Sequence, residues 1–409
     1  MTKDDILKAA FKVWGRDLYR TTSLTDIALE LGVSKPALYR HFKDKEALLD
    51  TMYTVYLDDC AAFIKNGCKE ALNAPSSYDT LLILIRTIGE YFIRNGEAFA
   101  FSLIQVYNNR NRKHVDDEFL IRGVDFKKLA QKEGNSDFYP SRMQLVLSSL
   151  IYSIAQFHRQ GHRDDDVSQT LAQIEGRIKK GMGLDAQRVA SLDYDALEQQ
   201  RSAVPLDETE ENALLKAVAG AVAEAGPWDA SMEMVARRSG LSKSGLYAHF
   251  KNKQDMISQL FIAEFLKIVN YAKVQIEASE VHEEQLYLAI ISIVDYLRSK
   301  PEILVAIDWI KTRRLGLAKE VPLRLYRVIE GIKFEAIRMY DRHLLVWAAQ
   351  WILFMIVNTL ALWPMEQDVL APCAGQEISK VMASNATKIP IESYRILFRF
   401  IALGLEGLY

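Results

Sequence analysis

Apolar residues along this chain recur every three or four positions, and strict alternation of apolar and polar residues is rare. The first pattern is typical of amphipathic helices and the second of half-buried strands, so the sequence predicts an all-α protein. In the first half we expect helices over residues 4–17, 25–31, 35–41, 45–66, 77–95, 97–105, 116–133, 142–160 and 167–181. In the second half we expect helices over residues 208–225, 231–239, 243–249, 253–276, 282–299, 301–311, 320–340, 342–362 and 389–406. Both halves show the same order: three short helices, a long fourth helix and then a bundle.

A short cassette occurs twice, as SKPALYRHFKDK at residues 34–45 and as SKSGLYAHFKNK at residues 242–253. With a constant displacement of 208 positions, residues 23–46 and 231–254 are identical at 11 of 24 positions without a gap. Little direct identity extends beyond this window, so the halves share architecture more than sequence. A duplication followed by divergence is the simplest explanation.

Each cassette follows a short amphipathic segment and a glycine, which is the pattern of a helix-turn-helix. Gly32 stands where a helix end needs a left-handed residue, Ser34 can cap the next helix, and Pro36 suits its first turn. Gly240 and Ser242 repeat these features in the second copy. In a DNA-binding unit of this kind, the second helix lies in the major groove.

The second helix of each unit has a predicted core face and a predicted solvent face. Leu38 and Phe42 are four residues apart and should point inward, as should Leu246 and Phe250. The solvent-side Tyr, His and Lys side chains can bind phosphates, and each cassette carries a net charge of +3. We expect DNA contacts from Thr25, Ser34, Lys35, Pro36, Ala37, Tyr39, Arg40, His41 and Lys45, and from Ser242, Lys243, Ser244, Gly245, Tyr247, His249 and Lys253. A plain packing corner is the alternative, but packing does not explain why solvent-side residues recur.

The repeated string resembles the signature of the TetR family of bacterial transcriptional regulators, S-K/R-x-x-L-Y-x-H/Y-F-x-x-K. It reads here as Ser34, Lys35, Leu38, Tyr39, His41, Phe42 and Lys45, and again as Ser242, Lys243, Leu246, Tyr247, His249, Phe250 and Lys253. The resemblance covers about 45 residues of each half. It implies a three-helix DNA-binding head and a helical ligand-binding body, with two subunits joined by a four-helix interface. It also implies repression that a small molecule relieves by binding the body.

Two heads in one chain depart from the family's pattern of a symmetric homodimer, so we expect an intramolecular pseudo-dimer. The expected segments are a first helix-turn-helix head (1–47), a first body (48–185), a linker (186–206), a second head (207–255) and a second body (256–409). The helices near 142–160 and 167–181 would pack against those near 342–362 and 389–406. Further self-association of the chain stays open.

The second helices of the two heads carry different side chains at three matching positions. The first presents Pro36, Ala37 and Arg40, and the second presents Ser244, Gly245 and Ala248 at the matching positions. Arginine can bind guanine or a phosphate and alanine can do neither, while glycine weakens a helix by up to about 1 kcal/mol. The operator is therefore expected to be asymmetric or imperfectly palindromic, unless the second head has drifted toward weak binding.

The bodies are rich in large apolar residues, which suits a hydrophobic or aromatic effector. Tyr152 and Trp351 lie on comparable predicted helices and are the first candidates to contact it. His158 and His162 are four residues apart but lack a third ligand nearby, so no metal site and no cofactor are expected. Residues 346–363 carry no charge, yet their polar side chains favour a buried helix over a membrane span.

Charge and motif content narrow the function. The net charge of −2 restricts nucleic-acid binding to local basic patches. The three scattered cysteines, Cys60, Cys68 and Cys373, favour reduced thiols in a cytoplasmic protein over a redox sensor, and no signal peptide is evident. No enzyme motif is present, so we expect a DNA-binding transcriptional regulator. The alternative is a helical ligand or protein sensor of the same fold that has weakened or lost DNA binding.

Overall fold

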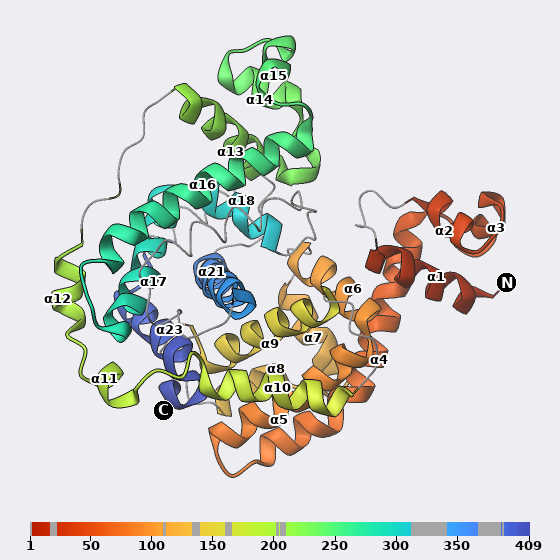
Figure 1. The fold of residues 1–409 in the computed structure, drawn as a ribbon. Coiled ribbons are helices and arrows are strands. Elements are labelled where there is room, and N and C mark those ends of the chain that lie inside the picture. Colours follow the sequence, from red (N-terminus) through yellow and green to blue (C-terminus); the bar gives the residue numbers. More distant parts are fainter. Residues whose placement is uncertain are drawn as a thin grey trace. The chain divides into compact units, whose positions relative to one another are not determined.

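The computed structural model describes residues 2–16, 23–108, 112–132, 140–159, 166–201, 204, 210–311, 342–366, 386 and 388–409. These residues form helices and contain no strand, which confirms the all-α prediction (Figure 1). They divide into two compact units, residues 1–176 and 177–409.

The first unit begins with three short helices and a long fourth one, as the periodicity predicts. Its helices are α1 (Lys3–Arg16), α2 (Leu24–Glu30), α3 (Lys35–Tyr39), α4 (Lys45–Asn73), α5 (Ser77–Arg94), α6 (Gly96–Asn108), α7 (Arg112–Ile121), α8 (Phe126–Lys132), α9 (Arg142–Arg159) and α10 (Val167–Lys180). The last turn of α10 belongs to the second unit.

The second unit repeats this order after two additional short helices. Its described helices are α11 (Ala186–Ala190), α12 (Tyr194–Gln199), α13 (Glu210–Asp229), α14 (Met232–Ser239), α15 (Lys243–His249), α16 (Lys253–Ile276), α17 (His282–Ser299), α18 (Pro301–Lys311), α21 (Arg342–Glu366) and α23 (Ile391–Leu403). A 3-10 helix (Gly404–Leu408) follows α23. The helix predicted over 320–340 lies outside the described residues.

The packing of the head against the body, and of the first two body helices against each other, repeats between the units. In the first unit α1 packs on α6, and α4 packs on α5; in the second unit α13 packs on α18, and α16 on α17. The ring of Phe11 on α1 meets that of Phe101 on α6 edge to face, with centroids 5.1 Å apart. In the second unit Ala223 of α13 and Val305 of α18 share an apolar cluster with Ala361 of α21. The two halves thus share architecture well beyond the cassette.

The prediction of one helix over 116–133 was wrong, because the chain turns between α7 and α8. Gly123 adopts a left-handed conformation with φ of +86°, which ends α7. Its amide donates to Leu120 O at 2.9 Å, and the Val124 amide donates to Phe119 O at 2.9 Å. The apolar pattern continues through this turn, so periodicity alone does not reveal it.

Helix α21 contains the whole uncharged stretch, residues 346–363, that the sequence analysis assigned to a buried helix. It contacts α17, α18 and α23 of its own unit. Its polar residues Asn358 and Thr359 are buried with the apolar ones, and the Thr359 hydroxyl donates to Met355 O at 2.9 Å. No helix within the described ranges is long and apolar enough to cross a membrane.

Residues 177–201, which we call the connector, are folded onto the second unit. The Met182 amide donates to Ile401 O at 2.8 Å, and the Leu184 amide donates to Ala402 O at 3.2 Å. Gly181 and Gly404 allow this close approach, because a Cβ atom at either position would collide with the backbone of the other segment. The connector includes α11 and α12, which lie within the range predicted as the linker.

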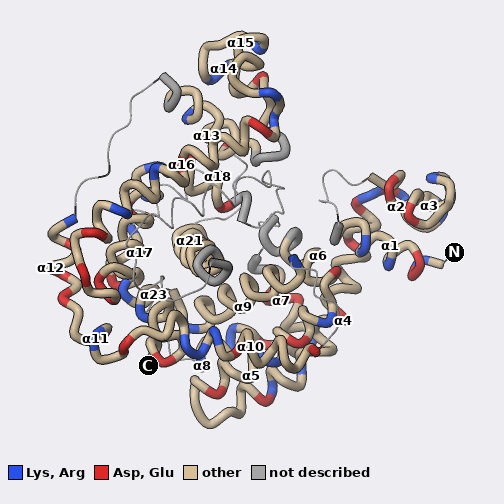
Figure 2. The backbone as a smooth tube through the Cα atoms, in the orientation of Figure 1, with Lys and Arg blue, Asp and Glu red and all other residues tan. Residues whose placement is uncertain are grey.

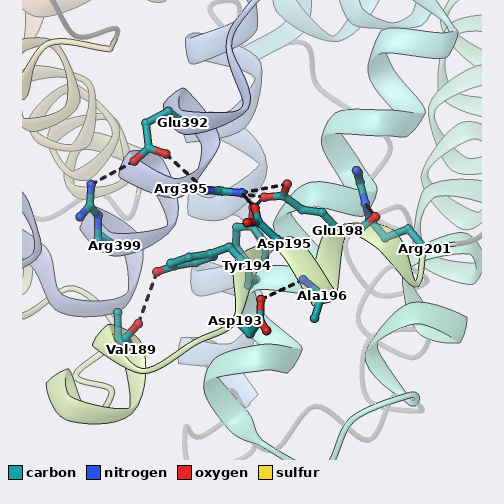
Figure 3. Close-up of polar contacts among 11 residues, drawn as sticks. Val189, Asp193, Tyr194, Asp195, Ala196, Glu198, Arg201, Glu392, Arg395 and Arg399 are labelled. Atoms are coloured by element: carbon teal, nitrogen blue, oxygen red, sulfur yellow. Dashed lines mark hydrogen bonds and ion pairs between the residues drawn. The ribbon is translucent and has the colours of Figure 1, made fainter.

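Arg395 of α23 holds α12 in place by charged hydrogen bonds (Figure 3). Its Nε and Nη2 donate to the two carboxylate oxygens of Glu198 at 2.9 and 3.0 Å, and Nη2 also donates to Asp195 at 2.5 Å. The hydroxyl of Tyr287 on α17 donates to the same Glu198 carboxylate at 2.5 Å. Hydrogen bonding to Glu198 raises the pKa of Arg395 above its ordinary value. The ring of Tyr194 packs against that of Tyr287, with centroids 4.9 Å apart.

Replacing Arg395 with alanine is expected to lower the free energy of unfolding of the second unit by about 2 kcal/mol, because Glu198 loses its charged hydrogen bonds. The measurement is urea unfolding of the full chain followed by tryptophan fluorescence, since five of the six tryptophans lie in the second half. Lys273→Ala removes an exposed ion pair to Glu277 in the same unit and should cost less than about 0.5 kcal/mol. Equal losses in the two variants would contradict the role assigned to Arg395.

Candidate nucleic-acid interface

The first head, α1 to α3, is built on a capped helix and a tight turn. Ser23 Oγ accepts from the Asp26 amide at 3.3 Å, and the Asp26 carboxylate accepts from the Ser23 amide at 2.6 Å. These hydrogen bonds to Ser23 lower the pKa of Asp26. Gly32 follows α2 with φ of +65°, and the Val33 amide donates to Ala28 O at 2.9 Å. The turn therefore sets the direction in which α3 leaves.

The second head, α13 to α15, uses the same turn. Ser231 Oγ accepts from the Met234 amide at 3.2 Å and caps α14. Gly240 follows with φ of +72°, and the Leu241 amide donates to Ala236 O at 3.1 Å. The predicted helix, glycine turn and helix are present in both heads.

The predicted core and solvent faces of α3 and α15 are also present. The core residues Leu38, Phe42, Leu246 and Phe250 are buried. Tyr39 is 47% exposed and Tyr247 is 51% exposed. The other exposed candidates are Thr25, Ser34, Lys35, Pro36, Arg40, Ser242, Lys243, Ser244 and His249, while Ala37, His41 and Gly245 are half-buried. Each head thus presents polar and basic side chains along one short helix.

Lys45 and Lys253 begin the long helices α4 and α16 and are half-buried. Partial burial lowers the pKa of Lys45, while the nearby Glu46 and Asp26 carboxylates act in the opposite direction. Burial also lowers the pKa of Lys253. Both amines are thus less open to solvent than Lys35 and Lys243, the lysines at the start of α3 and α15.

The two second helices differ in length and in capping. Helix α3 has 5 residues, and Ser34 makes no side-chain hydrogen bond at its start. Helix α15 has 7 residues, and Ser242 Oγ accepts from the Gly245 amide at 3.0 Å. Ser242 and Ser244 also share a hydrogen bond of 3.0 Å. The cap favours helix at the point where glycine disfavours it.

Ion pairs near the predicted DNA face differ between the heads. Figure 2 shows that both heads carry basic and acidic residues. Lys35 lies 5.9 Å from the ring centre of Tyr39. Its counterpart Lys243 instead forms an ion pair with Glu233, in the first turn of α14. Sequence reasoning did not identify Glu233, although the 208-residue displacement aligns it with Thr25 of the first head.

The two predicted effector residues lie inside their helical bodies. Tyr152 is buried on α9. Trp351 is buried on α21, and its ring stacks on that of Trp347 with centroids 5.4 Å apart. The guanidinium of Arg177 lies 5.2 Å from the Trp347 ring centre. The proposed effector role of Tyr152 and Trp351 stays a prediction.

Of the two histidines that are four residues apart, His158 lies on α9. His158 Nε2 is 2.9 Å from the carbonyl oxygen of Phe92, and its ring packs against that of Phe99. His162 lies outside the described residues. Within those ranges, no three His, Cys, Asp or Glu side chains are arranged to hold a metal ion. Cys60 and Cys68 are buried free thiols, and burial raises their pKa to about 12 and about 11.

Residues 6–52 and 214–260 each match the family described as "Bacterial regulatory proteins, tetR family". The two matches are displaced by the same 208 positions as the cassette, which confirms the tandem arrangement. Over 90 residues the chain is 36% identical to the uncharacterized HTH-type transcriptional regulator YerO of Bacillus subtilis, covering 22% of this chain and 30% of YerO. Over 153 residues it is 27% identical to the uncharacterized HTH-type transcriptional regulator YuxN of Bacillus subtilis. That match covers 37% of this chain and 42% of YuxN. Each match spans less than half of the relative's length.

Among solved structures, the fatty acid degradation regulator FadR from Bacillus halodurans aligns with a TM-score of 0.30. That alignment has 16% sequence identity and covers 49% of this chain and 98% of FadR.

Replacing Ser242 with alanine is expected to destabilise α15 by about 1 kcal/mol, because the Gly245 amide loses its acceptor. Ser34→Ala is the matched control and should have a smaller effect, since Ser34 makes no side-chain cap bond. The measurement is hydrogen exchange of the backbone amides in α3 and α15. Equal acceleration of exchange in the two helices would show that the caps are equivalent.

Proposed function

We propose, from the two tetR-family domains that this chain carries in tandem, that the protein is a transcriptional regulator that binds double-stranded DNA. The observation that carries the proposal is the repeated solvent face of α3 and α15. Tyr39 and Tyr247 are exposed above buried Leu38 and Leu246, where packing alone would not require an aromatic residue. Such a regulator would act in the cytoplasm, where its DNA lies.

The exposed residues divide into two proposed roles. The hydroxyls of Tyr39 and Tyr247 can donate to phosphate oxygens, and the lysines supply charge, so these residues would set the position of each head without reading sequence. Arg40 is exposed and can donate two hydrogen bonds to guanine, whereas Ala248 at the matching position cannot. The heads would therefore read different half-sites, and the operator would be asymmetric or imperfectly palindromic.

The bodies are the proposed site of regulation. Their buried aromatic residues, including Tyr152 and Trp351, suit a hydrophobic or aromatic effector. We propose that the protein represses transcription and that the effector releases it from DNA. We also propose that the two halves form an intramolecular pseudo-dimer. A sensor of the same fold that has lost DNA binding is the second candidate, and it predicts no binding to any DNA.

The purified full chain is expected to select duplexes from a random-sequence pool and to bind them less tightly as salt rises, because phosphate contacts release counterions. Electrophoretic shift assays at 50 and 200 mM salt provide the measurement. Failure to enrich any duplex at either salt concentration would favour the sensor. Enrichment of a perfect palindrome would contradict the asymmetric operator.

Arg40→Ala is expected to relax sequence preference in one half-site, with a loss of about 1–3 kcal/mol of discrimination at one base pair. Lys45→Ala is the matched control, because it removes the same charge and should weaken binding to all sequences alike. Sequencing of duplexes selected by the wild type and by both variants measures this. If the Arg40 variant selects the wild-type sequences, Arg40 does not read a base.

A further inference from the structure

Glu233 connects the two helices of the second helix-turn-helix at its predicted DNA face. It occupies the second position of α14, and its carboxylate forms an ion pair with the amine of Lys243, the first residue of α15. Both side chains are more than half exposed. The hydrogen bond between them raises the pKa of Lys243 and lowers the pKa of Glu233. The pair is therefore charged on a surface that meets polyanionic DNA in the proposed function.

Within the described part of the first head, no ion pair joins α2 to Lys35, and the acidic residue of α2 nearest this position is displaced by one. Thr25 occupies the position that matches Glu233. The next residue, Asp26, caps α2 by hydrogen bonds with Ser23. One residue along an α-helix is a rotation of about 100°, so a carboxylate at position 26 serves the cap and one at position 233 reaches the next helix. At the position that matches Glu233, the first head carries the neutral hydroxyl of Thr25.

Helix α14 also carries two arginines in its last turn. Arg238, in the last turn of α14, forms an ion pair with Glu224 of α13. Arg237 is exposed in that same last turn, one turn of helix beyond Glu233. The ion pair with Lys243 places Glu233 at the start of α15.

We propose that Glu233 is a positioning residue that weakens the phosphate contact of the second head, by holding Lys243 and by repelling the phosphate that Lys243 would bind. This inference rests on the proposed function, since it requires that the heads bind DNA. An exposed ion pair is weak enough for a phosphate to compete with it, so Glu233 attenuates binding and does not abolish it. The first head then forms the stronger contact with the DNA phosphates, through Lys35 at the start of α3.

The test compares Glu233→Thr with the reciprocal Thr25→Glu in the full chain. The probes are a duplex selected by the wild type from a random pool and a random-sequence duplex of equal length, each titrated between 50 and 200 mM salt. Glu233→Thr should tighten binding to both duplexes about 3- to 10-fold at 50 mM salt and steepen the slope of log K against log salt by about 0.9. Thr25→Glu should weaken binding and flatten the slope by a similar amount.

Three controls separate this effect from others. Glu277→Thr makes the same change in an exposed Lys–Glu pair at the end of α16, and it should leave DNA binding unchanged. Glu233→Gln should reproduce the gain if Glu233→Thr unfolds the head. Adding Lys243→Ala to Glu233→Thr should remove at least half of the gain.

The outcomes distinguish the two proposals. If the wild type binds neither duplex, the proposed function fails and this inference fails with it. If the wild type binds but both Glu233 variants keep its affinity and salt slope, only the inference is overturned. An equal gain from Glu277→Thr would assign the effect to net charge and would also overturn it.

Discussion

The charged hydrogen bonds between Arg395 and Glu198 join the connector to the last long helix, and the architecture of the second unit depends on them. The two residues are 197 positions apart, and both are largely removed from solvent. Tyr287 donates to the same carboxylate, so three helices meet at one side chain. Partners of this kind act as a group, because removing one leaves the others partly buried and unsatisfied. The segment between the two halves is therefore part of a folded unit, and the second unit begins within α10.

Most of the helices could be predicted from the sequence, because amphipathic periodicity persists over two turns or more. Helices α11 and α12 were not predicted, since 5 and 6 residues are too few to establish a period and no repeated motif identifies them, as the cassette does for the equally short α3. Their capping residues Asp185 and Asp193 were a visible signal, as each accepts from the amide three residues ahead. The contact of Arg395 with Glu198 could not be predicted, because no local pattern identifies a partner so distant in sequence.

The candidate interface likewise has a feature that the sequence predicts and one that it does not. The exposure of Tyr39 and Tyr247 followed from helix geometry, since Leu38 and Phe42 fix the face that points inward. The ion pair of Glu233 with Lys243 was not predicted, because it depends on how the turn at Gly240 brings two helices together. Comparison of the two copies nevertheless identifies the position. Where a repeat preserves the fold, each charge that differs between the copies is a candidate for a difference in function.

The ion pairs between the first two helices of each head show how far the two copies have diverged. In the first head Lys12 of α1 pairs with Glu30 of α2 at 2.5 Å. In the second head Glu224 of α13 pairs with Arg238 of α14, so the signs are reversed. A homodimer carries every substitution twice, and both of its heads change together. In this tandem chain each codon specifies a residue of one head only, so a mutation can alter either ion pair while the other head is inherited unchanged.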